Sequence, residues 1–286
     1  MTRIVYVNGR YRPYAHAMVH VEDRGFQLAD AVYEVCEVRG GAIVDRDRHL
    51  ARLVRSLGEL QIPMPMTLAA LHLVLRQTVR RNRVRDGLVY LQVSRGVAPR
   101  DFALPPPDTP VTIVCLARSL APERVAAQAE RGIAVVTVPD IRWRRCDIKT
   151  VMLLPAVLAK REAAHKGAKE AWLVDDAGLV TEGASSNAWI VTGEGRVVTA
   201  GLSVSILAGV TRATLIDAIA REGLTLEERR FTPAEAASAR EAFITSATNT
   251  VMPVVSIDGV TIGDGGPGSL TRRMRKIFRQ AMALSQ

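Results

Sequence analysis

Lys149 is the residue whose type and setting most clearly suggest chemistry. It follows Asp147 and Ile148, and Thr150 and then four apolar residues come after it. The chain uses arginine for almost every cation and contains only four other lysines. Arginine stays protonated in proteins, whereas a desolvated lysine can lose its proton and form a Schiff base. Lys149 is therefore a candidate nucleophilic amine, although a salt bridge to Asp147 or a surface position would also suit a lysine.

Two further segments could bind charged groups. Residues 180–190 predict a turn rich in small and hydroxyl side chains, with a single acid, Glu182, that leads into a strand. Gly209, Val210 and Thr211 stand before a helical run, so free N–H groups and the helix dipole predict an anion site there. Taken alone, the first segment could equally be an ordinary polar turn.

The elements that must position these residues fall into two predicted domains. Before residue 119 the patterns predict a hairpin around Asn-Gly, two helices and two strands, at 4–11, 47–60, 68–79, 88–93 and 111–116. The loop between the two strands is long enough to be functional. We predict an N-terminal α/β domain of residues 1–118, a linker of 119–123 and a larger C-terminal domain of 124–286 that begins with a strand at 133–138.

The C-terminal half alternates predicted strands with predicted helices. The strands are 171–174, 188–191, 197–199, 242–245 and 254–257, and the helices are 155–166, 210–222, 233–239 and 269–284. Hairpin-length connections favour an α+β fold, with a strand-rich core flanked by helices, over a doubly wound sheet. Neither a GxGxxG nor a P-loop pattern occurs.

Composition limits the class of protein. Hydrophobic content is 48%, yet no apolar stretch reaches membrane-spanning length, and no signal-peptide pattern opens the sequence, so we expect a cytoplasmic protein. Three cysteines lie far apart and are expected to be reduced and buried. His16 and His20 fall in a predicted strand, where residues four apart lie too far from each other for a metal pair, so no metal site is expected.

The net charge of +9 raises nucleic-acid binding as an alternative function. Arginines concentrate at residues 80–85 and 272–279. In the second cluster, apolar residues at helical spacing predict that the cations face solvent. No known nucleic-acid motif accompanies either cluster, so a basic nucleic-acid-binding or scaffold protein remains the lesser hypothesis.

Several motifs in a fixed order give the sequence a family resemblance. They are EDRGFQLADAVYEV at 22–35, YLQVSRG at 90–96, DIK at 147–149, TEGASSN at 181–187, GVTR at 209–212 and FITSAT at 243–248. Together they resemble the fold type IV pyridoxal-phosphate-dependent aminotransferases, and most of all the D-amino-acid aminotransferases. The resemblance covers nearly the whole chain. It implies a two-domain α+β fold, pyridoxal 5'-phosphate as cofactor, and ping-pong transamination between a D-amino acid and a 2-oxo acid.

The resemblance also implies roles at the cofactor. Lys149 becomes the catalytic Schiff-base lysine that also moves a proton, and Glu182 becomes the partner of the pyridine nitrogen. Leu207 would pack on the ring face. The implied phosphate ligands are Arg52, Val210, Thr211, Ser246 and Ala247. The predicted helix start at Gly209 supports the same phosphate site independently.

At the substrate, the resemblance implies a homodimer. Tyr33, Tyr90 and Arg100 would surround the α-carboxylate, with Arg100 reaching across on a loop of the other subunit. The best-known D-amino-acid aminotransferases have Arg-x-His in this loop, whereas this chain has Arg100, Asp101 and Phe102. The loss of one charge-assisted hydrogen bond would weaken carboxylate binding by about 1.5–3 kcal/mol.

That departure makes (R)-configured primary amines plausible substrates. Two further activities of the same fold stay open, namely aminotransfer from branched-chain L-amino acids and the aminodeoxychorismate lyase reaction.

Overall fold

The computed structural model describes residues 3–282, 284 and 285. The chain divides into two compact units. The first comprises Met1–Pro122, Ile148–Met152 and Ala283–Gln286, and the second comprises Glu123–Asp147 and Leu153–Met282. The units differ from the predicted ranges because Ile148–Met152 and Ala283–Gln286 belong to the first unit. The backbone of Ile148–Met152 explains its place in the first unit, since Thr150 forms an antiparallel bridge with Val32 of β3.

An antiparallel sheet forms the centre of the first unit. Its strands are β1 (Ile4–Val7), β2 (Arg10–Pro13), β3 (Ala31–Arg39), β4 (Ala42–Val44), β5 (Gly87–Ser94), β6 (Thr112–Ser119) and β16 (Leu284–Ser285). Across the described residues their order is β16-β4-β3-β5-β6-β1-β2. The predicted N-terminal hairpin is confirmed, because Val7 pairs with Arg10 around Asn8 and Gly9, both at positive φ.

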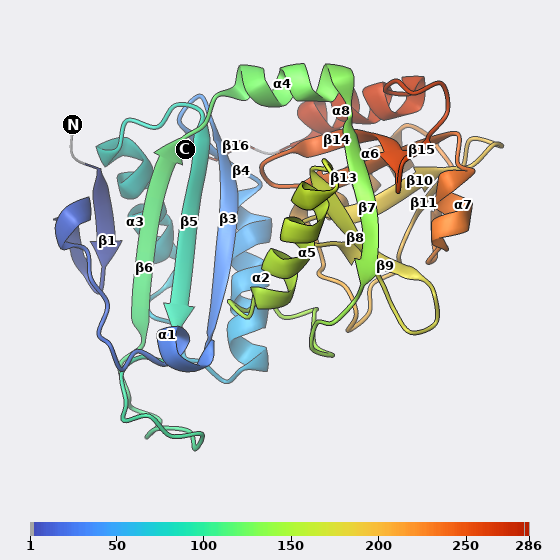
Figure 1. The fold of residues 1–286 in the computed structure, drawn as a ribbon. Helices are drawn as coiled ribbons and strands as arrows, with labels where there is room; N and C mark the ends of the chain where they lie inside the picture. The colour runs from blue at the N-terminus through green and yellow to red at the C-terminus, as the bar shows by residue number, and fades with distance from the viewer. Residues whose placement is uncertain (1–2, 283, 286) are drawn as a thin grey trace. The chain divides into compact units, whose positions relative to one another are not determined.

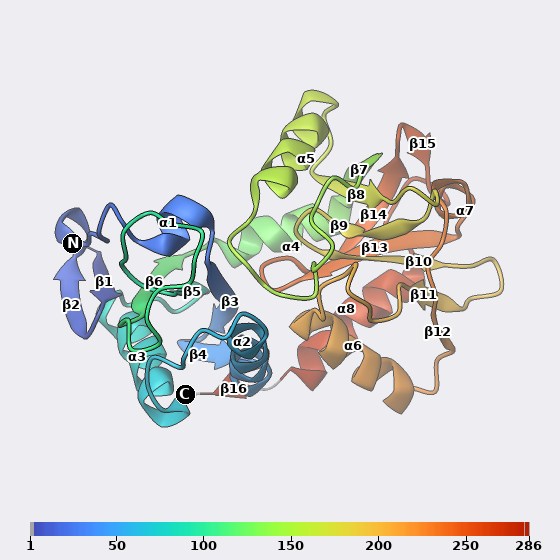
Figure 2. The ribbon, with the colours of Figure 1, turned by 90° about the horizontal axis from the view of Figure 1, so that it is seen from below.

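Helices cover one face of this sheet. The predicted helices are confirmed as α2 (Arg46–Glu59) and α3 (Leu68–Arg81), which lie on the same side in Figure 2. Their residues Leu53 and Leu71 are fully buried. The unit also contains α1 (Arg24–Leu28) and the 3₁₀ turn η1 (Tyr14–His16).

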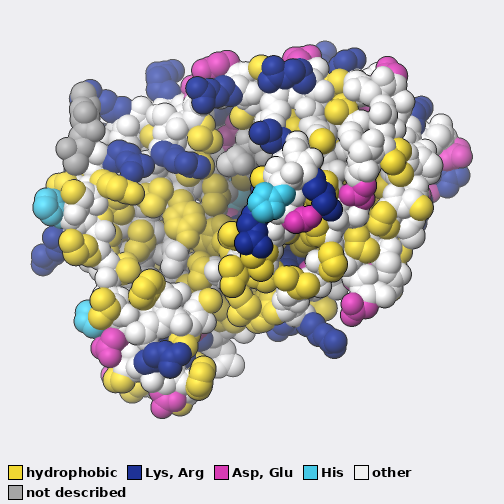
Figure 3. All heavy atoms as spheres, viewed as in Figure 1, with side chains coloured by type: hydrophobic (Ala, Val, Ile, Leu, Met, Phe, Trp, Pro, Cys, Tyr) yellow, Lys and Arg dark blue, Asp and Glu magenta, His cyan; other side chains and the backbone are white. Residues whose placement is uncertain are grey.

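The face of the sheet away from α2 and α3 remains partly exposed. On it Val35, Tyr90 and Leu116 stand side by side on neighbouring strands and are half-buried. Figure 3 shows apolar side chains gathered on this face of the first unit, over β5 and β6. Along these three strands, side chains that face the helices are buried and the side chains between them are half-buried. This is the two-residue period expected of a strand.

A mixed sheet forms the centre of the second unit. Its strands are β7 (Ile133–Pro139), β8 (Glu170–Val174), β9 (Val180–Gly183), β10 (Asn187–Val191), β11 (Val197–Thr199), β12 (Leu226–Glu228), β13 (Glu241–Ser246), β14 (Thr250–Ile257) and β15 (Val260–Thr261). The order is β12-β11-β10-β13-β14-β7-β8-β9, with β15 paired to β14. β7 runs parallel to both β8 and β14, whereas β10, β13 and β14 are antiparallel neighbours.

Helices flank this second sheet, as the sequence predicted, and they lie on both of its faces. They are α4 (Pro122–Arg131), α5 (Leu154–His165), α6 (Val210–Arg221), α7 (Pro233–Ala237) and α8 (Ser269–Ala281). Figure 2 shows α6 and α8 on one face and α5 on the other. Trp189 and Phe243 stack at 5.3 Å between ring centroids and are completely buried in the cluster that also contains residues of α6 and α8.

Three predicted elements need correction. The boundary between the two units falls inside the linker predicted at 119–123, but the linker is shorter than predicted, because β6 extends to Ser119 and α4 begins at Pro122. Proline can open a helix because its missing N–H is not needed there. The segment with His16 and His20 is not a strand, because β2 ends at Pro13, which leads into η1. The predicted helix 269–284 ends at Ala281, and Leu284 lies in β16.

Two predictions about side-chain exposure were also wrong. Arg275 does not face solvent; it is 9% exposed and donates to the backbone oxygens of Asn249 and Val251, which replace its water contacts. Cys146 is only half-buried, unlike Cys36 and Cys115. Among the described residues, no helix combines the length and apolar character required to cross a bilayer.

Candidate active site

Lys149 lies on an extended segment fixed against β3 in the first unit. Its carbonyl accepts a hydrogen bond from Tyr33 N at 3.0 Å, and Val151 N donates to Ala31 O at 3.1 Å. Its own N–H approaches Ser56 Oγ at 3.4 Å. These contacts hold the backbone of Lys149, and its Nζ lies 4.2 Å from the centre of the Tyr33 ring. The amine therefore sits on an aromatic face, a favourable position for a cation.

Tyr33 and Tyr90 form the aromatic pair beside this amine. Their rings stack with centroids 5.7 Å apart, and Tyr90 Oη donates to Gln92 Oε1 at 2.6 Å. Burial raises the pKa of Tyr90 to about 12, and the neighbouring Tyr33 adds to the shift. Tyr90 is therefore a neutral phenol at physiological pH. The structure thus brings together three of the residues predicted to act in the first unit.

Arg52 belongs to a buried ion-pair network. Its Nε and Nη2 donate to the two carboxylate oxygens of Glu34 at 2.8 and 2.7 Å, and His49 Nδ1 lies 2.8 Å from Glu34 Oε2. Although burial alone would raise the pKa of Glu34, Arg52 and His49 lower it to about 2. Burial lowers the pKa of His49, against the opposing effect of Glu34. Glu34 thus fixes the guanidinium of Arg52, whose side chain is 9% exposed.

Arg100 lies on an exposed loop whose backbone is held in place. Its guanidinium carbon is 6.0 Å from the centre of the Phe102 ring, and Phe102 is 84% exposed. Arg24 Nη1 donates to the carbonyls of Asp101 at 2.8 Å and Ala103 at 3.2 Å. Arg24 is itself buried and paired with Asp30. A buried arginine therefore restrains the backbone on both sides of Phe102.

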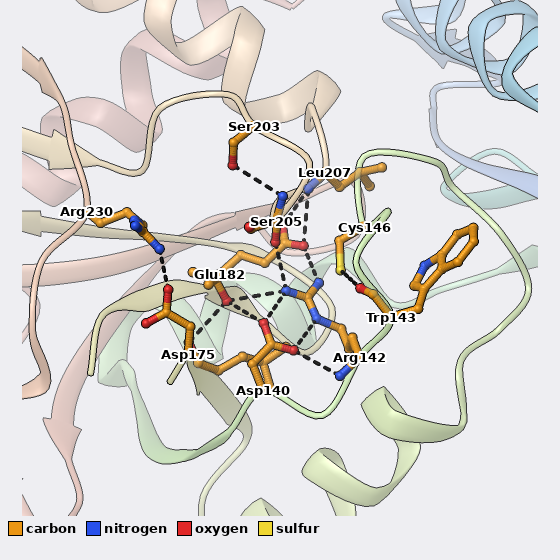
Figure 4. A network of polar contacts seen from close by, with 12 residues as sticks. Asp140, Arg142, Trp143, Cys146, Asp175, Glu182, Ser203, Ser205, Leu207 and Arg230 are labelled. Carbon is orange, nitrogen blue, oxygen red and sulfur yellow. Dashed lines mark hydrogen bonds and ion pairs between the residues drawn. The ribbon is translucent and has the colours of Figure 1, made fainter. Parts of the chain in front are cut away.

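In the second unit, Glu182 is a buried acid surrounded by donors. It lies in β9, so the predicted turn at this position is a strand. Arg142 Nη1 donates to its Oε1 at 2.5 Å, and Asn187 Nδ2 donates to its Oε2 at 3.0 Å. The backbone N–H of Leu207 lies 3.2 Å from both oxygens. Figure 4 shows Glu182 between Arg142 and Leu207. The predicted residues Glu182 and Leu207 are thus in direct contact.

Arg142 and Asn187 are the site residues that sequence reasoning missed. Arg142 lies in the arginine-rich run before Lys149, and Asn187 closes the motif that contains Glu182. Two nitrogens of Arg142 donate to the carboxylate of Asp140, at 2.9 and 2.8 Å. Although burial lowers the pKa of Arg142, Asp140 and Glu182 raise it above its ordinary value, so its charge is permanent. The sequence offered one indication of their role, namely that each lies within or beside a motif that contains a predicted site residue.

The start of α6 has backbone donors that no side chain caps. Gly209 is the N-cap residue and no side chain caps the helix, so the N–H groups of Val210 and Thr211 point out of the first turn without a side-chain acceptor. A Cβ on Gly209 would lie 2.0 Å from Asn187 Oδ1, so only glycine fits there. The helix dipole adds to the attraction for a phosphate or carboxylate.

Asn187 links this helix start to the end of β13, where Ser246 is the last residue and Ala247 follows. Asn187, which abuts Gly209, pairs across β10 and β13 with Thr245, the residue before Ser246. The turn between β13 and β14 is fixed by the buried Arg275, whose Nη1 donates to the carbonyls of Asn249 and Val251. The second unit therefore combines an oriented acid, Glu182, with an uncapped helix start, and Asn187 contacts both.

Comparison with known proteins decides the family. Residues 31–257 match the sequence profile described as amino-transferase class IV. The chain belongs to this family. It is 39% identical over 278 residues to a D-alanine aminotransferase of Bacillus licheniformis, covering 97% of this chain and 96% of the relative. It is 36% identical over 276 residues to that of Staphylococcus haemolyticus, covering 96% of each.

The fold agrees with this assignment. The class IV aminotransferase resembles the crystal structure of a T.th. branched-chain amino acid aminotransferase with pyridoxamine 5'-phosphate, with a TM-score of 0.89 and 25% identity. The match covers 98% of this chain and 94% of that one. The predicted α+β fold of type IV is confirmed, and pyridoxal 5'-phosphate is the cofactor. The buried acid and the uncapped helix start fit the pyridine nitrogen and the phosphate of that group.

Proposed function

We propose that this class IV aminotransferase moves an amino group from a D-amino acid to a 2-oxo acid in a ping-pong cycle. The observation that carries the proposal is the near full-length similarity to proteins named D-alanine aminotransferase, at 39% and 36% identity. The oriented acid Glu182 and the amine of Lys149 are the chemical groups that such a reaction needs.

Lys149 is the proposed covalent anchor of the cofactor and the base that moves a proton at the substrate Cα. When bound, pyridoxal phosphate supplies an electron sink for the carbanion formed there, so the protein needs to place one base accurately. The backbone hydrogen bonds from Tyr33 to Lys149 and from Val151 to Ala31 keep the Lys149 segment in place. The ring of Tyr33 limits where Nζ can move, which favours proton transfer on one face of the substrate.

Glu182 is the proposed partner of the pyridine nitrogen. An ionised carboxylate stabilises a protonated ring nitrogen and so favours electron withdrawal. The donors from Arg142 and Asn187 fix the plane of this carboxylate. Leu207, whose N–H also reaches Glu182, would pack on the ring face.

The proposed phosphate ligands are a cation and a set of uncharged donors. Arg52 supplies the charge, since the ion pair with Glu34 holds its guanidinium in one orientation. The backbone N–H groups at the start of α6 and in the turn after β13 supply directed donors, with two hydroxyls beside them. These donors belong to Val210, Thr211, Ser246 and Ala247.

Substrate recognition is assigned to Tyr33, Tyr90 and Arg100, and we propose that Arg100 acts across a homodimer. The first unit exposes apolar side chains that a second copy would cover, including Phe26 at 74% and Phe102 at 84%. A neutral Tyr90 phenol can donate to a carboxylate when its O–H turns away from Gln92 Oε1. Phe102 supplies no such donor, so we expect weaker carboxylate binding than Arg-x-His would give.

The test is a half-reaction panel with the pyridoxal-phosphate-loaded protein. D-alanine, D-glutamate, L-leucine and an (R)-amine are added separately, and loss of the visible cofactor band is followed together with formation of the aminated cofactor. The proposal predicts conversion by the D-amino acids and not by L-leucine. Conversion by L-leucine alone would overturn it in favour of branched-chain aminotransfer. Pyruvate release from aminodeoxychorismate without an added oxo acid would indicate the lyase.

Mixed dimers test the cross-subunit role of Arg100. Lys149→Ala and Arg100→Ala chains are each expected to be nearly inactive. If Arg100 acts on its partner's site, unfolding and refolding the two together restores activity, because one site in each mixed dimer keeps both residues. If Arg100 acts within its own chain, no mixed dimer has an intact site and activity stays low. Light scattering on the same samples measures whether dimers form.

A further inference from the structure

We propose that Arg142 is a positioning residue that sets the orientation of Glu182 and of the loop carrying Leu207. The inference rests on the proposed function, because it assigns to Arg142 a role through the residue that would meet the pyridine nitrogen. It adds a residue that the motifs alone did not identify.

Arg142 joins three segments of the second unit. From the loop that follows β7, its Nη1 donates to Glu182 on β9 at 2.5 Å. Its Nη2 donates to the carbonyl of Ser205 at 3.0 Å, two residues before Leu207. Asp140 holds the other side of the guanidinium with two hydrogen bonds. Figure 4 shows Arg142 at the centre of this network.

The contacts of Glu182 show what this arrangement achieves. Arg142 takes one carboxylate oxygen and Asn187 the other, while Leu207 N lies between them. A carboxylate with donors on both oxygens cannot rotate freely about its last bond, so its remaining lone pairs keep a fixed direction. Because the same guanidinium binds Ser205 O, the acid and the Leu207 loop are held in one relative position.

The shape of arginine matters as well as its charge. The guanidinium uses Nε, Nη1 and Nη2 on three different partners. A lysine ammonium on a flexible chain cannot present three donors in one fixed plane. Asp140 balances one positive charge, and its own pKa is lowered because the hydrogen bonds from Arg142 outweigh the effect of burial.

The experiment compares Arg142→Lys, which keeps the charge, and Arg142→Gln, which removes it, with Arg144→Gln as the control. Arg144 lies two residues away and is exposed. Each protein is titrated with pyridoxal phosphate, and kcat and KM for D-alanine are measured. Thermal unfolding of the cofactor-free proteins shows whether each variant folds.

We expect both Arg142 variants to bind the cofactor about tenfold or more weakly, the size of a lost charge-assisted hydrogen bond. We also expect kcat to fall while KM for D-alanine stays near that of the wild type, because Arg142 acts at the ring end of the site. Arg144→Gln should match the wild type. Failure of Arg142→Lys to restore binding would show that geometry, and not charge alone, matters.

Other outcomes separate this inference from the proposed function. If the wild type neither binds pyridoxal phosphate nor converts D-alanine, the proposed function fails. If the wild type does both and the folded Arg142 variants behave like Arg144→Gln, only the role of Arg142 is overturned. Full recovery in Arg142→Lys would also overturn it, since charge would then suffice.

Discussion

Replacing Glu34 by Gln tests the buried network that holds Arg52. The Glu34 side chain is 2% exposed and its carboxylate binds Arg52 twice. Its pKa falls from 4.5 to about 2 in the folded protein. At 1.36 kcal/mol for each unit of pKa, the ionised carboxylate contributes about 3 kcal/mol to the free energy of unfolding. Because the folded pKa is the lower one, this contribution is complete above pH 4.5 and is lost as the pH falls toward 2.

The assay is urea unfolding of the wild type and variants between pH 7 and acid. At pH 7, Glu34→Gln should reduce the free energy of unfolding by about 3–5 kcal/mol, because Arg52 would remain buried without its partner. The difference from the wild type should shrink below pH 4.5. Glu37→Gln is the matched control on the same strand, since Glu37 is 17% exposed and pairs with the half-buried Arg39. Its effect should be below about 1 kcal/mol. Equal effects of the two substitutions, or a pH-independent difference for Glu34→Gln, would refute the reasoning.

Two further predictions concern the substrate loop. Phe102→His should restore a hydrogen-bond donor to the substrate carboxylate beside Arg100. KM for D-alanine should then fall about tenfold, the value of one charge-assisted hydrogen bond. An unchanged KM would show that another donor already compensates. Arg24→Lys should raise KM with little change in kcat, because lysine cannot hold the carbonyls of Asp101 and Ala103 as arginine does. A fall in kcat alone would contradict a role in loop placement.

Local patterns in the sequence predicted much of the fold. The helical spacing of Leu50, Leu53 and Leu57 identified α2, and the Asn-Gly pair identified the first hairpin, because both signals lie within a few residues. α4 was missed although Val125 and Ala129 have helical spacing, because its other residues are mostly polar or alanine. Elements with a weak apolar face are hard to recognise without their packing partner.

The contacts within the candidate site could not be predicted from local sequence patterns. Motif resemblance predicted Glu182 as the important acid, yet Arg142, its partner at 2.5 Å, lies 40 residues earlier in the sequence. Arg275 likewise has the spacing of a solvent-facing cation and is buried against a turn from a different part of the chain. Long-range pairs of this kind depend on how strands align, and a single sequence does not specify that alignment.

Trapping the bond between Lys149 and the cofactor tests the central claim most directly. The pyridoxal-phosphate-loaded protein is reduced with borohydride and digested, and the peptides are identified by mass spectrometry. The account predicts that the reduced phosphopyridoxyl group is found on Lys149, and that adding D-alanine before reduction removes it. Labelling of Lys160, Lys166, Lys169 or Lys276 in place of Lys149, or a label that D-alanine does not remove, would contradict it.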